Sequence, residues 1–239
     1  MSQQREQADL SLVHLTRPPQ EQPAEGLRPP LLALLHGVGS NERDLFGLAP
    51  ELDPRFRIVS ARGPLTRGPS RYAWFDVQFL SGGRFRINPE QLEASRQDLM
   101  TFLREAVEAY EADPERIYLM GFSQGAIMSL TLALTEPRLL AGVAAISGRI
   151  PPEVRPWAVS PEETAGLPVI VTHGLADTVI SVDWARRARE TLERQRVALT
   201  YGEHDEGHSI PTATLAEVTA WLTQQLNEPR WTVRDVSHI

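Results

Sequence analysis

The 239 residues hold 24 lysines and arginines against 31 aspartates and glutamates, which gives a formal net charge of -7 at neutral pH. Such a chain lacks the basic surface that attracts nucleic acids and anionic membranes, so neither is expected as a partner. With 41% hydrophobic and 23% charged residues the composition is that of a globular protein, and one domain over residues 1–239 is expected, with its core at 10–226 and a tail at 227–239.

Cysteine is absent from the sequence. Disulfides, thiolate-held zinc, iron–sulfur clusters and a cysteine nucleophile are therefore excluded. Residues 1–9 are polar and lack the apolar core of a signal peptide, and the most apolar run, residues 31–35, is too short to cross a bilayer. The protein is accordingly expected in the cytoplasm, without stable membrane insertion.

Short apolar stretches recur along the chain, bounded by glycine, proline or charged residues. Residues 10–16 alternate polar and apolar, as a half-buried strand does. Continuous runs are typical of strands buried on both faces of a parallel sheet, and they occur at residues 31–36, 57–60, 117–120, 142–146 and 169–172. A further strand is predicted at residues 197–201.

Apolar residues at helical spacing occupy the intervals between these strands. Helices are predicted at residues 89–112, 124–135, 182–195 and 211–226. Asn88 before a proline marks the start of the first, and the second is apolar nearly all round, so it should be buried. Strands that alternate with helices predict an α/β fold, with a mostly parallel sheet covered on both faces.

Three stretches show little periodicity. Residues 18–30, with five prolines, are expected to form an exposed connection between the first two strands, and residues 149–166 form a second proline-rich excursion. Residues 62–86 form a longer segment, and long segments of this kind are usually functional. It carries arginines at 62, 67, 71, 84 and 86. They could attract an acidic substrate, but a solvated face that offsets the acidic balance is favoured.

The pentapeptide Gly121-Phe122-Ser123-Gln124-Gly125 joins a predicted strand to the predicted buried helix. This is the setting of a nucleophile elbow, in which a serine sits on a sharp strand–turn–helix and glycines two positions away relieve crowding. An ordinary buried turn is the alternative. We predict Ser123 as a nucleophile.

A serine hydroxyl needs a base, and in such enzymes the chain order is serine, acid, histidine. Asp177 follows the predicted strand at 169–172, at the sheet edge where functional groups gather, and is predicted to orient the base; a turn aspartate or helix cap is the alternative. His208 is favoured as the base because it follows a glycine and precedes the last helix. His204 is expected on the surface.

The four-residue gap between His204 and His208 also fits a metal site that includes Asp205 or Glu206. Glycines at 202 and 207 favour a loop over the helix that such ligand pairs normally share. A third ligand at a diagnostic spacing is missing. Neither a metal nor any other cofactor is expected.

Ester hydrolysis through a tetrahedral intermediate requires two backbone donors for the oxyanion. Gln124, next to the nucleophile, is predicted to supply one. The other is predicted from Val38, in the sequence His36-Gly37-Val38-Gly39-Ser40 after an earlier strand. A glycine-rich turn without a ligand is the alternative, and His36 is expected to be structural.

Five segments in order, HGVGSNERDLFGLAP, YAWFD, GFSQGAIMSL, HGLADTVI and GHSI, resemble the phospholipase/carboxylesterase family of α/β-hydrolases. The resemblance runs from about residue 31 to residue 226. It implies an α/β-hydrolase fold with little or no cap, acting on carboxylic esters or thioesters. The triad would be Ser123, Asp177 and His208.

The same resemblance implies that Val38 and Gln124 are the oxyanion donors and that Trp74 and Phe75 form an aromatic wall beside the acyl pocket. Members of this group occur as monomers and dimers, so a homodimer is compatible with it.

The leading hypothesis is a serine carboxylesterase that hydrolyses short- to medium-chain esters of small molecules through an acyl-enzyme. Thioesters and lysophospholipids stay open as substrates, because pocket depth is not readable from sequence. A hydrolase-fold binding protein is disfavoured, since such proteins usually lose a triad member. A metal-assisted hydrolase that uses His204 and His208 is the second enzyme class.

Overall fold

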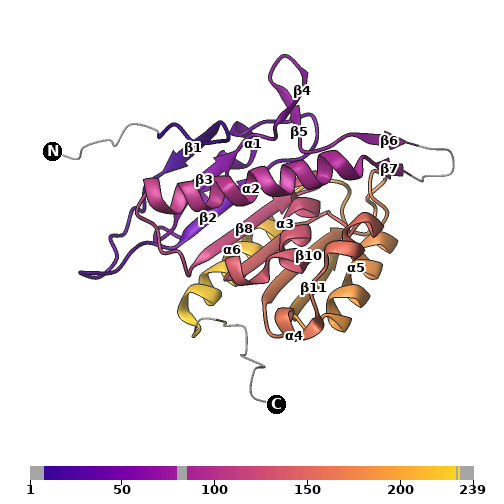
Figure 1. Cartoon of the computed structure of the whole chain (residues 1–239). Helices are drawn as coiled ribbons and strands as arrows, with labels where there is room; N and C mark the ends of the chain where they lie inside the picture. Colours follow the sequence, from indigo (N-terminus) through magenta and orange to yellow (C-terminus); the bar gives the residue numbers. More distant parts are fainter. Residues whose placement is uncertain (1–7, 80–84, 230, 232–239) are drawn as a thin grey trace.

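The computed structural model describes residues 8–79, 85–229 and 231. Within these residues a seven-stranded sheet runs through the centre of the molecule (Figure 1). In spatial order its strands are β1 (His14–Arg17), β3 (Arg57–Ala61), β2 (Leu31–Leu35), β8 (Ile117–Phe122), β9 (Gly142–Ile146), β10 (Pro168–Gly174) and β11 (Ala198–His204). Only β1 is antiparallel to its neighbour. The predicted mostly parallel sheet is thus confirmed.

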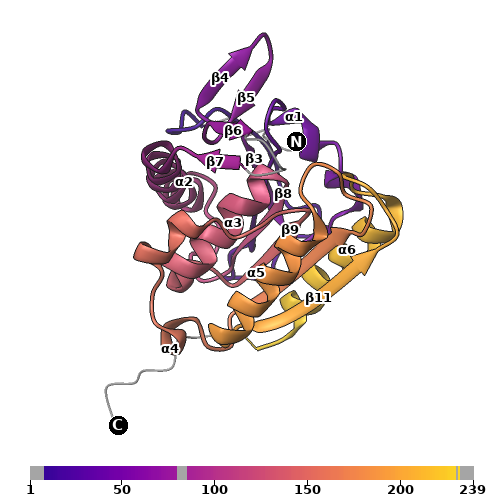
Figure 2. The same cartoon turned by 90° about the vertical axis from the view of Figure 1, so that its right-hand side faces the viewer.

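Helices cover both faces of this sheet (Figure 2). They are α1 (Arg43–Phe46), α2 (Pro89–Ala109), α3 (Gln124–Thr135), α4 (Pro161–Thr164), α5 (Val182–Arg194) and α6 (Thr212–Asn227), with 3-10 turns at Ala49–Glu51, Pro137–Leu139 and Pro152–Trp157. Asn88 caps α2 as predicted, because its side chain accepts hydrogen bonds from the backbone of Glu90 and Gln91. The four predicted helices are all present. Most of the predicted tail at 227–239 lies outside the described residues.

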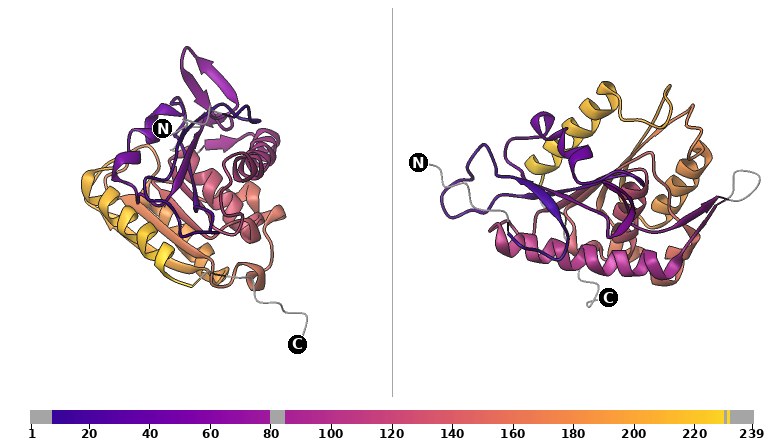
Figure 3. Two further views of the ribbon diagram at one scale, coloured as in Figure 1. Left: turned by 90° about the vertical axis from the view of Figure 1, so that its left-hand side faces the viewer. Right: turned by 90° about the horizontal axis from the view of Figure 1, so that it is seen from above.

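The alternation of buried side chains along β2 shows how the two faces are filled. Leu31, Ala33 and Leu35 belong to the core under α2 and α3, whereas Leu32 and Leu34 belong to the core under α1 and α6. Figure 3 shows α2 and α6 on opposite sides of the sheet. Because helices cover both faces of the sheet, every residue of β2 is apolar. The strand therefore lacks the alternation of polar and apolar residues that a half-exposed strand shows.

The strand order reverses direction between β2 and β8. The chain runs from β2 outward to β3, but from β8 through β9 and β10 to β11 it runs the other way. Ligands of open α/β sheets bind at such a switch point, beyond the carboxyl ends of the strands. The segment from His36 to Ser40 follows β2, and Ser123 follows β8, so both lie at this point.

The segment at 62–86, predicted to be irregular, contains two small hairpins. One joins β4 (Leu65–Gly68) to β5 (Arg71–Ala73), and the other joins β6 (Val77–Phe79) to β7 (Phe85–Ile87). Figure 1 shows β6 and β7 beyond the amino-terminal end of α2, away from the central sheet. The second hairpin contributes one wall of the site described next.

Candidate active site

Ser123 is the single residue that connects β8, which ends at Phe122, to α3, which begins at Gln124. Its backbone has φ 54° and ψ -114°, a sparsely populated conformation with positive φ that costs a residue other than glycine roughly 1–3 kcal/mol. The Ser123 N–H donates to the carbonyl of Ile146 over 2.9 Å, which holds the turn against β9. A serine kept in a strained turn at the end of a central strand is the geometry of a nucleophile elbow.

The glycines around Ser123 are required by backbone packing. A Cβ on Gly125 would lie 1.9 Å from the carbonyl oxygen of Leu35, and one on Gly121 would lie 2.3 Å from that of Gly125. Both neighbours are main-chain atoms that cannot rotate away. The two glycines therefore have separate structural reasons: Gly125 lets α3 approach the end of β2, and Gly121 lets β8 approach the first turn of α3.

Ser123, His208 and Asp177 form one hydrogen-bonded chain. The Nε2 atom of His208 lies 2.9 Å from the Ser123 hydroxyl oxygen, and its Nδ1 atom lies 2.7 Å from the Oδ2 atom of Asp177. The Phe122 ring packs beside the imidazole at 4.9 Å between centroids. Ser123 and Asp177 are 5% and 7% exposed. The three side chains proposed from their order in the sequence thus meet in space.

The loop after β10 fixes the Asp177 carboxylate. Its Oδ1 atom accepts hydrogen bonds from the backbone of Val179 and Ile180, both at 2.8 Å. His173, near the end of β10, donates from Nε2 to the carbonyl of Ile180 over 2.7 Å and lies 3.3 Å from Oδ2 of Asp177. Burial lowers the pKa of His173, which favours the neutral ring. Sequence reasoning did not assign His173 a part, although it opens the HGLADTVI segment.

Gly174 allows the His208 loop to approach Asp177. A Cβ on Gly174 would lie 2.4 Å from the carbonyl oxygens of both Glu206 and Gly207. Ala176 N–H donates to Glu206 O over 2.8 Å, and this bond joins the two loops. His204 points elsewhere, because its Nε2 lies 2.8 Å from a carboxylate oxygen of Glu217 on α6.

The loop after β2 passes beside Ser123. A Cβ on Gly37 would lie 3.4 Å from the Cβ of Ser123. Two hydrogen bonds of the buried His36 ring fix this loop: its Nδ1–H donates to Gly37 O at 2.7 Å, and its Nε2 accepts from Gly63 N–H at 2.9 Å. Burial lowers the pKa of His36, consistent with a neutral ring that both donates and accepts. His36 is therefore structural.

The two candidate oxyanion donors, Val38 and Gln124, line the same cavity as Ser123. Gln124 is the first residue of α3, where a backbone N–H has no acceptor within the helix. The helix amino terminus adds a partial positive charge at this position. The Gln124 backbone is therefore placed where negative charge on a substrate oxygen could be bound, and Val38 lines the same cavity.

The Gln124 side chain has a separate structural role. Its Oε1 accepts from the Trp74 backbone N–H and its Nε2 donates to the Phe75 carbonyl, both at 2.7 Å. The Trp74 indole N–H donates to the His36 carbonyl over 3.0 Å. These bonds tie the segment before β6 to the elbow and to the loop after β2.

The cavity at Ser123 has a volume of about 240 Å³. Its apolar lining residues are Val38, Phe75, Val77, Phe85, Ile127, Val179 and Ile180. Phe75 therefore lines the cavity that contains Ser123. Trp74 is fully buried and is not among the lining residues, so its contribution is indirect, through the support of Phe75 and of the loop after β2.

Two of the arginines of residues 62–86, Arg62 and Arg67, are paired with carboxylates. Arg62 donates two hydrogen bonds to Glu42, at 2.6 and 2.7 Å. Arg67 lines the cavity but forms an ion pair with Asp76, and Arg84 lies outside the described residues. Paired in this way, Arg62 and Arg67 present little free positive charge to an incoming substrate.

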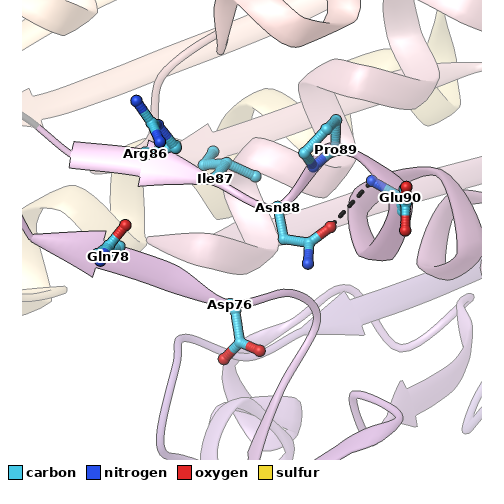
Figure 4. Close-up of a pocket in the computed structure, with 7 residues that line it drawn as sticks. All are labelled: Asp76, Gln78, Arg86, Ile87, Asn88, Pro89 and Glu90. Carbon is cyan, nitrogen blue, oxygen red and sulfur yellow. Dashed lines mark hydrogen bonds between the residues drawn. The ribbon is translucent and has the colours of Figure 1, made fainter.

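A second, larger depression of about 420 Å³ lies on the other side of Asp76, between the β6–β7 hairpin and the start of α2 (Figure 4). Polar residues such as Gln78, Arg86 and Asn88 line it, and Asn88 there accepts from Glu90 N–H over 3.0 Å. Ser123 and His208 do not line it. The depression is therefore separate from the hydrogen-bonded chain.

A metal centre finds no support in the part of the chain that the structure describes, where no three His, Asp or Glu side chains are grouped as ligands. In the same residues no helix is long and apolar enough to span a membrane.

Comparison with known proteins identifies relatives of similar length. Residues 22–226 match the family model described as Phospholipase/Carboxylesterase. Acyl-protein thioesterase 1 of Yarrowia lipolytica is 24% identical over 221 residues, covering 86% of this chain and 96% of its own length. Carboxylesterase SOBER1 of Arabidopsis thaliana is 26% identical over 158 residues, covering 64% of this chain and 68% of its own length.

Among solved structures, the Bacillus cereus carboxylesterase superimposes with a TM-score of 0.77 at 24% identity, over 90% of this chain and 94% of that one. The predicted α/β-hydrolase fold is confirmed by this similarity together with the parallel sheet.

Proposed function

Because the chain belongs to the phospholipase/carboxylesterase family, we propose that it hydrolyses short- to medium-chain carboxylic esters of small molecules through an acyl-enzyme on Ser123. The observation that carries this proposal is the hydrogen-bonded chain from Ser123 through His208 to Asp177. Relatives named as carboxylesterases and thioesterases support ester or thioester hydrolysis as the reaction class.

In the proposed mechanism, the Ser123 oxygen bonds to the ester carbonyl carbon while its proton passes to Nε2 of His208. The electron pair of the C=O bond moves onto oxygen, which is held by the backbone N–H groups of Val38 and Gln124. The intermediate then collapses, the bond to the alcohol oxygen breaks, and that oxygen takes the proton from His208.

Deacylation repeats the sequence with water as the nucleophile. The water oxygen bonds to the acyl carbonyl carbon while its proton passes to His208. The bond from the acyl carbon to the Ser123 oxygen then breaks, that oxygen takes the proton from His208, and the acid is released. Asp177 accepts a hydrogen bond from Nδ1–H of His208 throughout, which keeps the Nε2 lone pair directed at the nucleophile. No cofactor enters these steps.

The cavity favours small acyl groups. Its volume of about 240 Å³ and its apolar lining suit a chain of a few carbons better than a fatty acyl tail. Thioesters and lysophospholipids are the alternative substrates of the same site. The relatives named as acyl-protein thioesterases support thioesters as one of these alternatives.

Initial hydrolysis rates for p-nitrophenyl esters from acetyl to palmitoyl test the proposal. We expect kcat/KM to rise with acyl length up to about eight carbons and to rise no further towards palmitoyl, since only a methylene that enters the cavity contributes, by roughly 0.8 kcal/mol. A peak at palmitoyl would redirect the assignment to lipid or acyl-protein substrates. Absence of hydrolysis for every ester and for butyryl thioesters, in folded protein, would refute the enzymatic function.

A further inference from the structure

A cavity of about 310 Å³ lies between α3, the 3-10 turn at Pro152–Trp157 and α5. Its lining is mostly apolar and includes Leu134, Ile150, Val154 and Trp184. Ser123 and His208 do not line it, so it has no part in the proposed chemistry. We call it the rear cavity, and we call the cavity at Ser123 the acyl cavity.

Two segments of the chain pass from one cavity to the other. On α3, Ile127 lines the acyl cavity and Leu134 lines the rear cavity. These two residues are two helical turns apart, or about 10 Å along the axis, so their side chains lie on the same face of the helix. In the segment that leads into α5, Ile180 lines the acyl cavity and Trp184 lines the rear cavity. The two cavities therefore follow one another along α3.

Phe85, Arg149 and Trp184 form a stack of three side chains. The guanidinium carbon of Arg149 lies 3.5 Å from the centroid of the Phe85 ring and 4.8 Å from that of Trp184. The two ring centroids lie 5.7 Å apart. Of the two cavities, Phe85 lines the acyl cavity alone and Trp184 lines the rear cavity alone, whereas Arg149 lines neither. The stack therefore forms a wall between them.

Arg149 completes this wall from within the protein. It is 2% exposed, and the attraction of its cation to both rings holds the three side chains together. A Cβ on the preceding Gly148 would lie 2.5 Å from the Cβ of Ala126, so the backbone that carries Arg149 packs directly on α3. Its Nε atom is buried without a hydrogen-bond partner, and an apolar residue would fill this space without desolvating a charge. The stack is therefore formed at a cost in stability, which indicates a role other than packing.

We propose that Arg149 is a specificity-determining residue that limits the length of the acyl group by closing the path from the acyl cavity to the rear cavity. An acyl chain on Ser123 passes Ile127 and ends at the Phe85 ring. With a small side chain in place of Arg149, the Phe85 ring can turn into the vacated space, and the acyl chain can extend along α3 towards Leu134. This inference rests on the proposed hydrolase function and names what limits its substrate.

The test measures the ratio of kcat/KM for p-nitrophenyl dodecanoate to that for p-nitrophenyl octanoate in the wild type and in Arg149→Ala. Each methylene that enters the opened path should raise kcat/KM by up to about fourfold. We expect a ratio of about one in the wild type and a rise of at least about tenfold in Arg149→Ala, since four methylenes can then enter. Arg149→Met, which keeps a side chain of similar volume without its charge, should retain the wild-type ratio, because the wall excludes the chain by its volume.

Arg189→Ala is the matched control, since Arg189 also stacks on an aromatic ring, that of Tyr201 at 5.4 Å, but is exposed and lines neither cavity. Its ratio should equal that of the wild type. Thermal unfolding checks that Arg149→Ala folds, and Arg149→Val, which leaves a smaller void, takes its place with the same expected rise if it does not. A smaller rise in the folded variant, or an equal rise in Arg149→Met, would overturn the proposal.

Binding to Ser123→Ala separates the two hypotheses, because it does not require catalysis. Dodecanoate and octanoate are titrated calorimetrically into Ser123→Ala and into Ser123→Ala/Arg149→Ala. We expect the second substitution to raise the affinity for dodecanoate relative to octanoate by at least about tenfold. If the wild type hydrolyses no ester, the hydrolase function fails, and this gain alone decides whether Arg149 closes the path. A smaller gain, or binding of neither acid to either protein, rejects the wall.

Discussion

Replacing Ser123 with alanine is expected to lower kcat for p-nitrophenyl butyrate by about 10⁴–10⁶-fold, the loss typical of removing the nucleophile from a serine hydrolase. The hydroxyl oxygen is the atom that accepts the acyl group, and among the described residues it is the only hydroxyl that hydrogen-bonds to His208, over 2.9 Å. Alanine keeps the backbone and adds no atoms, so the fold should be retained. The loss would be measured by comparing the steady-state rate of Ser123→Ala with rates of the wild-type protein diluted over about five orders of magnitude.

Ser147→Ala is the matched control for this substitution. Ser147 is also a buried serine with a positive φ, 52°, and it follows the neighbouring strand β9. It has no place in the proposed mechanism, so its activity should stay within about threefold of wild type, the scale of an ordinary small perturbation near 0.6 kcal/mol. A Ser123→Ala protein that retains more than a tenth of the activity would remove Ser123 from the role of nucleophile.

Changing Asp177 to asparagine is expected to reduce kcat by about 10³–10⁴-fold, through the tautomer of His208. In the native protein Oδ1 is occupied by the Val179 and Ile180 backbone donors, and Oδ2 faces Nδ1 of His208. An asparagine would keep its carbonyl toward the two backbone donors and turn its NH₂ group toward His208. The imidazole would then carry its proton on Nε2 and donate to Ser123, so it could not act as a base.

The control for this change is Asp183→Asn, an aspartate with a 68% exposed side chain in the first turn of α5. It removes the same charge from the same region and should leave kcat within about twofold, since exposed charges contribute little. Thermal unfolding should show Asp177→Asn folded, because the bonds to Oδ1 survive. Activity near wild type in folded Asp177→Asn would show that another group orients His208.

Elements specified by local signals could be predicted closely from the sequence. The predicted bounds at 124–135 and 142–146 match α3 and β9, because a glycine turn or a continuous apolar run delimits each. The strand predicted at 10–16 is found at His14–Arg17 instead. Its register depends on pairing with β3, where His14 faces Ala61, and Ser11 is held by Glu105 of α2. Those partners are distant in the sequence and leave no local pattern.

The hairpins within residues 62–86 were missed for a related reason. Their strands are three or four residues long, too short for an alternating pattern to be distinguished from a loop. They are positioned by contacts with other segments, such as the bonds from Gln124 to Trp74 and Phe75. The aromatic wall was therefore predicted only through a family resemblance.

The proposed site itself could be predicted because its residues occupy recognisable positions, each within three residues of a glycine and after a strand or before a helix. The supporting residues could not. In the sequence His173 resembles an ordinary strand residue. Its contacts with Ile180 and Asp177 form only because the loop after β10 turns back over the end of the strand. Arg149 opens a proline-rich stretch without helical or strand periodicity, and only the folded chain shows it buried between Phe85 and Trp184. Both depend on long-range packing that no local pattern encodes.

Labelling with diisopropyl fluorophosphate, followed by peptide mass spectrometry, would identify the nucleophile. We predict one adduct per chain, on Ser123, with activity lost in proportion to labelling and no adduct in Ser123→Ala. Activity should also survive EDTA, since no metal takes part in the proposed steps. Full activity after complete labelling of Ser123, or resistance to the organophosphate combined with loss of activity in EDTA, would contradict the proposed mechanism and favour a metal-assisted hydrolase.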